Sequence, residues 1–416
     1  MKSDSSSKIK HWLYIVGLMI AGESIYLLPY LRKTFQTSME VVFEISTMQV
    51  SWLNTIFGII AVICYFPSGW LADRISARRL LTISLLTTSA GGFFMFSIPS
   101  YPLLLVLHAF WGITSILTFW AALIKATRNW GNPQNQGISF GLLDGGRGVV
   151  AAVFASLATA AYSIFDNVEE SLQSVLLIYS VAPLIAGIII WFVIPENQYV
   201  SRGNNTKKLR TVNRVAVKKA LQMKQIWLLA LVVFCAYMLH VGSYDFPAYA
   251  ERAYGQSKIF GAVLGTIRDW MRPVAAIMAG LLADRFRSSK TVGASFLLLV
   301  FSFLSLSIIK PASQYLWILW VQVILSALAI FSLRGVYFAI LEETKVPLSL
   351  TGTAVGIVSF IGFSPDTFSH ALSGWFVQNF PQSGYRYYFA ILTFIAVVGL
   401  VASIRITKFS SKQAGK

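Results

Sequence analysis

The feature that most constrains this chain is a series of apolar runs, each about as long as a helix needs to cross a membrane. A bilayer core of about 30 Å requires roughly 20 apolar residues per helix. By this criterion the candidate segments are residues 11–31, 48–72, 79–99, 102–125, 137–162, 171–194, 225–248, 259–283, 291–309, 313–340, 350–377 and 385–407. Because backbone groups in lipid must be satisfied within a segment, these twelve runs predict α-helices rather than the short alternating strands of a barrel.

The composition agrees with this interpretation. Hydrophobic residues make up 56% of the 416 residues and charged residues only 12%, whereas globular proteins have about 25% charged residues. A soluble protein with so few charges could not cover its surface, so much of that surface must face lipid. The composition excludes disorder, a coiled coil and an ordinary cytosolic enzyme. It predicts an all-α polytopic membrane protein embedded in the lipid bilayer.

Residue types that build catalytic or metal sites are sparse. Cys64 and Cys235 each lie inside an apolar run, and the four histidines are scattered without i,i+4 pairs, so neither a CxxC site nor a histidine metal site is expected. The sequence also contains no phosphate-binding P-loop. We therefore expect no metal, no cofactor and no enzymatic activity.

The lysine and arginine residues predict which side each loop faces. With the N-terminus inside, the cytoplasmic segments hold 24 basic residues, the opposite side holds 6, and 4 lie within spans. This bias predicts a multi-pass protein of the cell inner membrane with both termini in the cytoplasm. Topology and attraction to anionic lipid headgroups account for most of the net charge of +17, so no nucleic-acid partner is needed.

A polar, strongly basic segment at 195–224 separates six spans from six spans. Residues 69–74 read GWLADR and residues 280–285 read GLLADR, at an offset of 211 residues. Parallel repeats of six spans are typical of transporters in which one half was duplicated around a central site. We therefore expect an N-terminal six-helix half at 1–194, a cytoplasmic linker at 195–224 and a C-terminal six-helix half at 225–416.

The repeated motif resembles that of the major facilitator superfamily, which carries G-x-L-a-D-r-x-G-r-K/R between its second and third spans. The first copy departs from that pattern at Ser76, where the family usually has glycine. The resemblance covers essentially the whole chain and implies a secondary transporter whose two halves rock around a site near mid-membrane. The stretches 125–128, 137–148 and 364–366 are similar to bacterial permeases of the sugar-phosphate and organic-anion branches.

We interpret the two motif copies as a conformational latch. In one state Asp73 accepts hydrogen bonds from helix N-terminal amides and nearby arginines, and in the other it releases them. The alternative is a solvated turn. The predicted latch residues are Gly69, Asp73, Arg74 and Arg78 in the first copy and Gly280, Asp284 and Arg285 in the second.

Charged residues within the spans need a partner or a wet cavity, because each costs at least ~2.5–3.5 kcal/mol at the helix centre. Arg268 and Arg272 share a helical face, and in the repeat they align with the apolar Phe57 and Ala61. Two guanidiniums on one face are unfavourable without an anion or carboxylates between them, so the pair predicts an anion site. The predicted substrate-binding residues are Arg268, Arg272, Arg334, Arg147 and Tyr26. The alternatives are that these arginines only neutralise carboxylates, and that Asp144 and Arg147 form an intrahelical pair.

Carboxyl groups within the spans are candidates for proton coupling, because lipid disfavours their charged form and so allows them to exchange a proton. Glu23 lies midway along the first span, and Asp245 and Asp366 stand beside prolines that we expect to interrupt their helices. Together with Asp269 they form the predicted proton-coupling set. The alternatives are that Glu23 pairs with an arginine and that the prolines only form hinges.

These features predict a secondary active transporter that moves a small organic anion, of the sugar phosphate or sugar acid class, by alternating access. We expect coupling to protons or to a counter-anion, and a monomer. The alternatives are an exporter of drug-like or siderophore-like compounds, or a membrane sensor with a transporter fold. Short tails and a linker without an evident domain argue against the sensor.

A reporter fused after Lys416 or inserted within 202–214 should read as cytoplasmic, and one inserted after Glu169 should read as external, because basic loops stay inside. Alkaline phosphatase and fluorescent-protein fusions at these positions measure the topology. An external C-terminus would contradict the twelve-span count.

Overall fold

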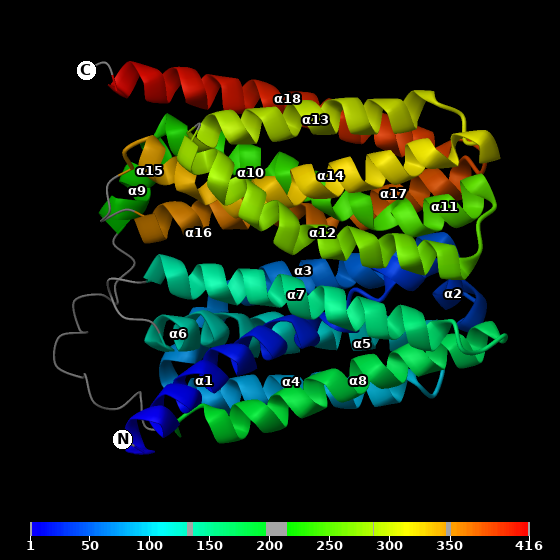
Figure 1. The fold of residues 1–416 in the computed structure, drawn as a ribbon, viewed down its shortest axis with the longest axis horizontal. Helices are drawn as coiled ribbons and strands as arrows, with labels where there is room; N and C mark the ends of the chain where they lie inside the picture. Colours follow the sequence, from blue (N-terminus) through cyan, green and yellow to red (C-terminus); the bar gives the residue numbers. More distant parts are fainter. Residues whose placement is uncertain (1, 131–135, 197–213, 286, 347–350, 415–416) are drawn as a thin grey trace. The chain divides into compact units, whose positions relative to one another are not determined.

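The computed structural model describes residues 2–130, 136–196, 214–285, 287–346 and 351–414. All regular secondary structure in these ranges is helical (Figure 1), which confirms the predicted all-α class. The chain divides into two compact units, each with its own internal packing. Unit 1 comprises Met1–Ser201 and Gln256–Pro273, and unit 2 comprises Arg202–Gly255 and Val274–Lys416.

The predicted halves 1–194 and 225–416 stay predictions, because the compact units divide the chain differently. Residues Gln256–Pro273, which we assigned to the C-terminal half, pack within unit 1. Most of the predicted linker lies outside the described residues, so its role as a linker stays a prediction.

The helices of unit 1 are α1 (Lys2–Leu27), α2 (Arg32–Val42), α3 (Thr47–Arg74), α4 (Ala77–Met95), α5 (Tyr101–Gly112), the π-helix η1 (Ile113–Trp120), α6 (Ala121–Trp130), α7 (Gln136–Tyr162), α8 (Val168–Val193) and the first part of α12 (Lys258–Arg285). Unit 2 contains the rest of α12 and α9 (Arg214–Gln222), α10 (Lys224–Gly242), η5 (Ser243–Asp245), α11 (Phe246–Tyr254), α13 (Ser288–Ile308), η6 (Ser313–Tyr315), α14 (Leu316–Val336), η7 (Tyr337–Ala339), α15 (Ile340–Glu343), α16 (Thr351–Gly362), η9 (Ser364–Thr367), α17 (Ser369–Asn379) and α18 (Gly384–Ala414).

Nine helical stretches within the described ranges are long and apolar enough to cross a membrane, which confirms a multi-pass protein. The predicted spans 79–99, 259–283 and 350–377 are helical but are not among the nine. The first is rich in serine, threonine and glycine, the second carries three charges, and the third is broken by η9. The count of twelve spans therefore stays a prediction.

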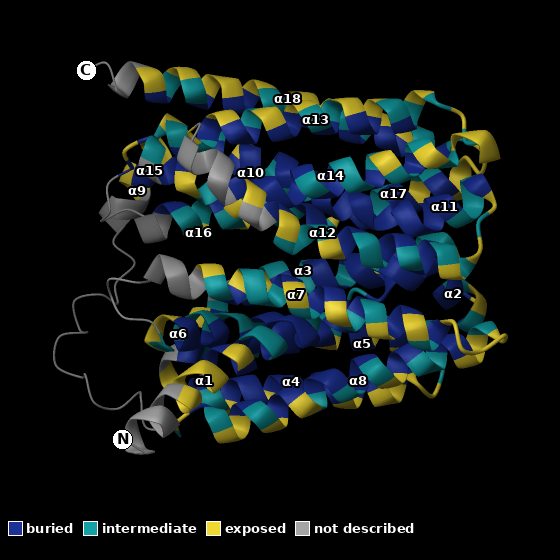
Figure 2. Ribbon diagram, in the orientation of Figure 1, coloured by how far each residue is buried: buried dark blue, intermediate teal, exposed yellow. Residues whose placement is uncertain are grey.

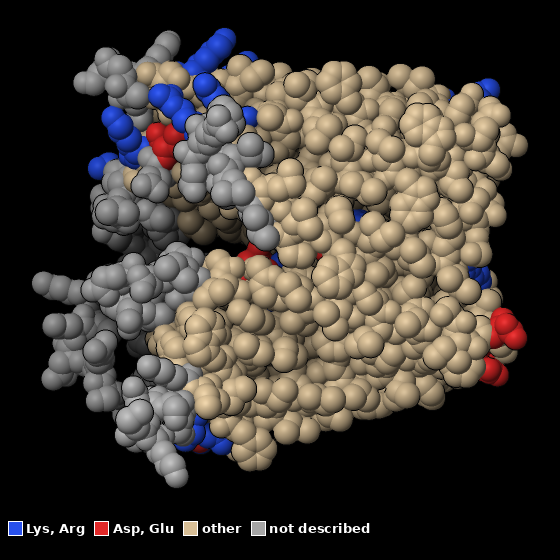
Figure 3. Space-filling model, in the orientation of Figure 1, with Lys and Arg blue, Asp and Glu red and all other residues tan. Residues whose placement is uncertain are grey.

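The outer surfaces of the helices are suited to lipid. Figure 3 shows one face of the molecule, on which most of the surface along the helices carries no charge. Large apolar side chains are exposed in each unit, for example Phe192 in unit 1 and Phe394 in unit 2. Such surfaces would be costly in water and are favourable in a bilayer.

Local sequence signals explain where several helices begin and end. Ser46 caps α3 in a capping box, because its Oγ accepts from the Gln49 N–H while the Gln49 side chain accepts from the Ser46 N–H. Asn167 caps α8 with a single hydrogen bond, in which its Oδ1 accepts from the Glu169 N–H. Gly255 ends α11 at a φ of 65°, a left-handed conformation that favours glycine.

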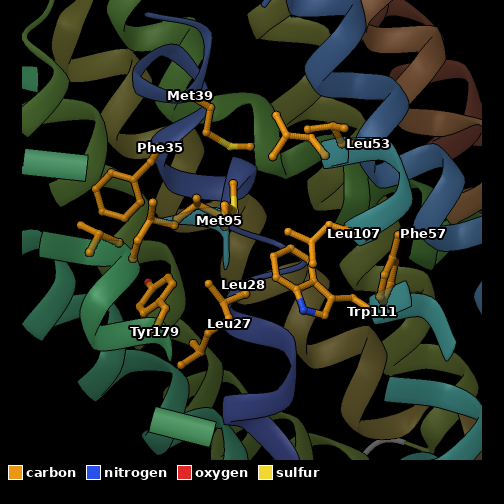
Figure 4. Close-up of a cluster of buried hydrophobic side chains, with 14 of the residues drawn as sticks. Leu27, Leu28, Phe35, Met39, Leu53, Phe57, Met95, Leu107, Trp111 and Tyr179 are labelled. Atoms are coloured by element: carbon orange, nitrogen blue, oxygen red, sulfur yellow. The ribbon is translucent and has the colours of Figure 1, made fainter. Parts of the chain in front are cut away.

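The interior of unit 1 combines a large apolar core with hydrogen bonds between helices. Figure 4 shows part of this core, with Phe35, Trp111 and Tyr179 among the labelled side chains. Trp111 is fully buried, and its Nε1 donates to the Thr88 carbonyl at 3.2 Å. The hydroxyls of Thr88 and Thr114 also pair at 2.8 Å, so α4 is joined to α5 and to the π-helix by polar contacts that lipid cannot replace.

Small residues allow α4 and α8 to approach closely (Figure 1). Along both helices buried residues alternate with exposed ones (Figure 2). One face of each helix therefore packs against the protein interior, and the other face is exposed. An added Cβ at Gly92 on α4 would overlap Ser180 Oγ on α8 and would lie 2.5 Å from Leu28 Cδ1. Glycine is therefore required at this contact for packing reasons.

Gly92→Ala should lower the stability of the protein by about 1–3 kcal/mol, because the extra methyl group forces α4 away from α8. The control is Gly141→Ala on α7, where an added Cβ would meet no atom within 4 Å. Thermal unfolding of the two purified variants in the same detergent compares them. Equal melting temperatures would contradict the packing described for Gly92.

Candidate functional site

The first group of charged side chains lies in unit 1, on α1, α7 and the first part of α12. Glu23 Oε2 lies 3.4 Å from Arg147 Nε and 3.4 Å from Arg272 Nη1. Arg272 Nη2 donates to Asp144 Oδ1 at 2.7 Å, whereas Arg147 Nη1 is 3.9 Å from the same oxygen. We call Glu23, Asp144, Arg147 and Arg272 the unit 1 charge cluster.

Glycines in the neighbouring sequence leave room for these arginines. A Cβ at Gly22 would lie 3.0 Å from Arg147 Cδ, and a Cβ at Gly148 would lie 3.1 Å from Arg272 Cγ. Both distances are shorter than ordinary van der Waals contact, so a larger residue would require the arginine side chain to shift by a few tenths of an ångström. Gly22 on α1 and Gly148 on α7 therefore leave room for the two arginine side chains.

Three of the four members are shielded from solvent, whereas the Asp144 side chain is 58% exposed. Glu23 is 8% exposed, and the side chains of Arg147 and Arg272 are each 12% exposed. Removing one partner of a buried ion pair leaves an uncompensated charge, so the members depend on one another. The Arg147 guanidinium also lies 5.7 Å from the ring centroids of Tyr26 and Trp120, within the range of cation–π attraction.

A second ion-pair group in unit 1 joins α2 to α12. Lys33 Nζ lies 2.7 Å from Asp269 Oδ2, and Arg268 Nη1 lies 3.1 Å from Asp269 Oδ1. Arg268 and Asp269 are almost fully buried. One carboxylate thus compensates two cations, and the guanidinium and the ammonium each bind a different oxygen.

These contacts bear on the roles predicted for the two arginines of α12. Arg268 and Arg272 have separate carboxylate partners, as the charge-neutralising alternative expects. Their roles in substrate binding stay predictions. The predicted intrahelical pair of Asp144 and Arg147 is present at 3.9 Å, but Asp144 lies closer to Arg272.

A third group of polar side chains lies in unit 2. Tyr237 donates to Asp366 Oδ2 at 2.6 Å, and His370 Nε2 lies 3.7 Å from Asp366 Oδ1. Arg334 contacts His240 Nε2, and the Tyr244 hydroxyl lies 3.1 Å from the same nitrogen. The unit 2 polar cluster consists of Tyr237, His240, Tyr244, Arg334, Asp366 and His370.

Two of the predicted proton-coupling residues lie where helices are interrupted. Asp245 ends the short 3-10 helix between α10 and α11, and Asp366 lies in the 3-10 helix between α16 and α17. The expectation that prolines interrupt these helices is confirmed by Pro247 and Pro365 at the starts of α11 and η9. Asp245 Oδ2 accepts from the Ser373 hydroxyl at 2.6 Å, so the first break is joined to α17 by a hydrogen bond.

The predicted latch is only partly within the described residues. An added Cβ at Gly69 would meet no atom within 4 Å, and Arg74 is exposed. The Arg78 Cζ lies 4.0 Å from the centroid of the Trp191 ring, and its Nη1 lies 3.9 Å from Glu196 Oε2. The other four, Asp73, Gly280, Asp284 and Arg285, belong to helices α3 and α12, but their side chains lie outside the described part. The latch therefore stays a prediction.

The sequence did not single out Lys33, Tyr237, His240 or His370 as site residues. Lys33 was counted with an external loop, and the histidines were considered only as metal ligands. Within the described ranges, no group of three histidine, cysteine or carboxylate side chains is placed to hold a metal ion. The position of His240, buried in the middle of an apolar run, is the signal that could have drawn attention to it.

Comparison with known proteins identifies the family. The model of the Major Facilitator Superfamily matches residues 13–369. The chain belongs to the major facilitator superfamily. It is therefore a membrane transporter rather than an enzyme, and the expected resemblance is confirmed.

Two relatives of this superfamily member come from Escherichia coli strain K12. The chain is 26% identical to inner membrane protein YihN over 408 residues, which cover 97% of each chain. It is 27% identical to inner membrane protein YqcE over 382 residues, which cover 90% of this chain and 89% of the relative. These names support an inner-membrane location, while the orientation of the termini stays a prediction.

Solved structures share the major facilitator fold with this chain. A bacterial homologue of the human lysosomal transporter Spinster, in an inward-facing and unoccupied conformation, aligns with a TM-score of 0.75 over 96% of this chain and 98% of that chain. The nucleoside transporter NupG aligns with a TM-score of 0.69 over 95% and 98%. Both are 14% identical to this chain, so the likeness concerns the fold alone.

Asp269→Asn should lower stability by about 3–5 kcal/mol, because Lys33 and Arg268 would remain buried without their counter-charge. The control is Asp166→Asn, which changes an exposed aspartate in the α7–α8 connection. Thermal unfolding in detergent measures both variants. If the two unfold at the same temperature, the ion pairs of Asp269 do not contribute to stability.

Proposed function

We propose that this transporter carries a small organic anion, of the sugar phosphate or sugar acid class, coupled to protons or to a counter-anion. The observation that carries this proposal is the environment of Arg334. Its guanidinium contacts a histidine, and no carboxylate within the described residues lies at ion-pair distance from it. A cation inside a span needs compensation, and a bound anion would supply it.

The charges of unit 1 support the same substrate class. Three carboxylates, Glu23, Asp144 and Asp269, face four cations in direct contact, so these two groups of ion pairs hold one more positive than negative charge. The four cations are Lys33, Arg147, Arg268 and Arg272. Guanidinium presents a planar fork of donors that matches a carboxylate or a phosphate.

Glu23 is the leading candidate for coupling in unit 1. Its carboxylate contacts both Arg147 and Arg272, so protonation would weaken two ion pairs at once. The arginines would then be available to an anion, and deprotonation would restore the original pairs. Asp245, Asp269 and Asp366 remain further candidates, and Tyr26 and Arg147 remain candidates for substrate contact.

Ligand-induced stabilisation of the purified protein tests the substrate class. Gluconate and glucose phosphate should each raise the melting temperature, and a ligand present at 100 times its Kd adds about 2.7 kcal/mol. Glucose and glucosamine, which are neutral and cationic, should leave it unchanged. Stabilisation by the neutral or cationic compounds alone would contradict the anion proposal and favour the exporter alternative.

Arg334→Lys should raise the Kd for the stabilising anion about tenfold, equivalent to about 1.4 kcal/mol, because lysine keeps the charge but not the fork. Arg405→Lys, at an exposed position on α18, is the control. Isothermal titration calorimetry measures the Kd of the anion for each of the two variants. Unchanged affinity in Arg334→Lys would remove Arg334 from the binding site.

A further inference from the structure

The contact between Arg334 and His240 fixes the state of the histidine ring. A guanidinium has only donors and no acceptor. His240 Nε2 must therefore offer its lone pair to Arg334, so the ring is neutral and carries its proton on Nδ1. A protonated ring would present an N–H toward the guanidinium, and two like charges would face each other.

His240 is buried, and the groups around it come from several elements of unit 2. Its ring centroid lies 5.8 Å from that of Tyr237, 5.1 Å from that of Tyr244 and 5.7 Å from that of Phe331. The titratable and charged groups of this environment include Tyr237 on α10, Tyr244 and the buried Asp245 in η5, and Arg334 on α14. They also include Asp366 in η9, which accepts from Tyr237, and His370 on α17, whose ring stacks on Tyr244.

We infer that His240 takes up the coupling proton at the same place where the substrate anion binds, between its Nε2 and the Arg334 guanidinium. This inference rests on the proposed function and assigns one of its coupling ions. When the anion enters, its oxygen atoms accept hydrogen bonds from Arg334. The guanidinium then no longer donates to the Nε2 lone pair. Water on the side of the membrane to which the transporter is open then supplies a proton to Nε2. The new N–H donates to the anion.

The step is balanced in charge and in protons. Before the anion binds, His240 and Arg334 together carry one positive charge. Afterwards both side chains are positively charged and face the anion. When the anion leaves, the two cations would face each other alone, so Nε2 releases its proton to water and again accepts from Arg334. Proton and anion therefore enter and leave together, which makes the transport a symport of the two.

His240 suits this task better than the neighbouring groups of the cluster. His370 contacts a carboxylate at 3.7 Å rather than a cation, and Asp366 already accepts from Tyr237. His240 is the residue whose ring nitrogen contacts the guanidinium whose donors an anion would take over. Histidine is also the side chain whose ordinary titration range lies closest to neutral pH.

Calorimetric titration of the full-length protein with gluconate, in buffers of different ionisation enthalpy, counts the protons taken up on binding. We expect about one proton per bound gluconate, and an affinity that falls about tenfold for each unit of rising pH above neutrality. His240→Gln keeps an acceptor for Arg334 but cannot be protonated. It should bind gluconate without proton uptake and with an affinity independent of pH.

His108→Gln is the matched control, because His108 is also buried but belongs to unit 1 and lies outside the clusters described above. It should retain the proton uptake of the original chain. Proton uptake that persists in His240→Gln would overturn the inference and leave the proposed function intact. If neither gluconate nor glucose phosphate binds the original chain, the proposed function itself fails.

Histidine-selective nitrogen NMR provides a test that needs no substitution. On addition of gluconate to the original chain, one of the four histidine rings should change from neutral to protonated. This result would support the inference even if His240→Gln did not fold. Binding of gluconate without a change in any histidine ring would overturn it.

Discussion

A charged side chain within a membrane span costs at least about 2.5–3.5 kcal/mol unless a partner compensates it, and the interior of unit 1 is organised around this constraint. Glu23, Asp144 and Asp269 each lie in contact with a cation from another helix. The pairs link α1, α2, α7 and the first part of α12, whose lipid-facing surfaces have no comparable attraction to one another. The same residues that endanger insertion in the membrane thus determine which helices associate.

The fold follows closely from the sequence because its main signal is physical and local. An apolar run of sufficient length has to be helical in lipid, and each of the twelve predicted segments contains helix in the described residues. Prolines beside Asp245 and Asp366 correctly indicated helix breaks. The number of spans is harder to obtain, since α12 carries charges along its length and α16 and α17 are short.

Several members of the charged clusters could be predicted from the sequence, but their pairings could not. Glu23, Arg147 and Arg272 stand out in the sequence because charge is rare in apolar runs, yet spacing alone paired Asp144 with Arg147 and grouped Arg268 with Arg272. In the structure Asp144 lies closer to Arg272, a residue 128 positions away. Lys33 and His240 escaped notice, because a partner on another helix leaves no trace in local spacing.

The π-helix Ile113–Trp120 has a consequence for the span in which it lies. An α-helix turns by about 100° per residue, and a π-helix places one more residue in each turn. Every side chain beyond this segment is therefore out of phase with a helical wheel drawn from Tyr101. Shortening the segment by one residue would swing α6 around its axis and carry Lys125 away from the Ala72 carbonyl, to which it donates at 2.7 Å. The extra residue sets the angular position of everything that follows it along the span.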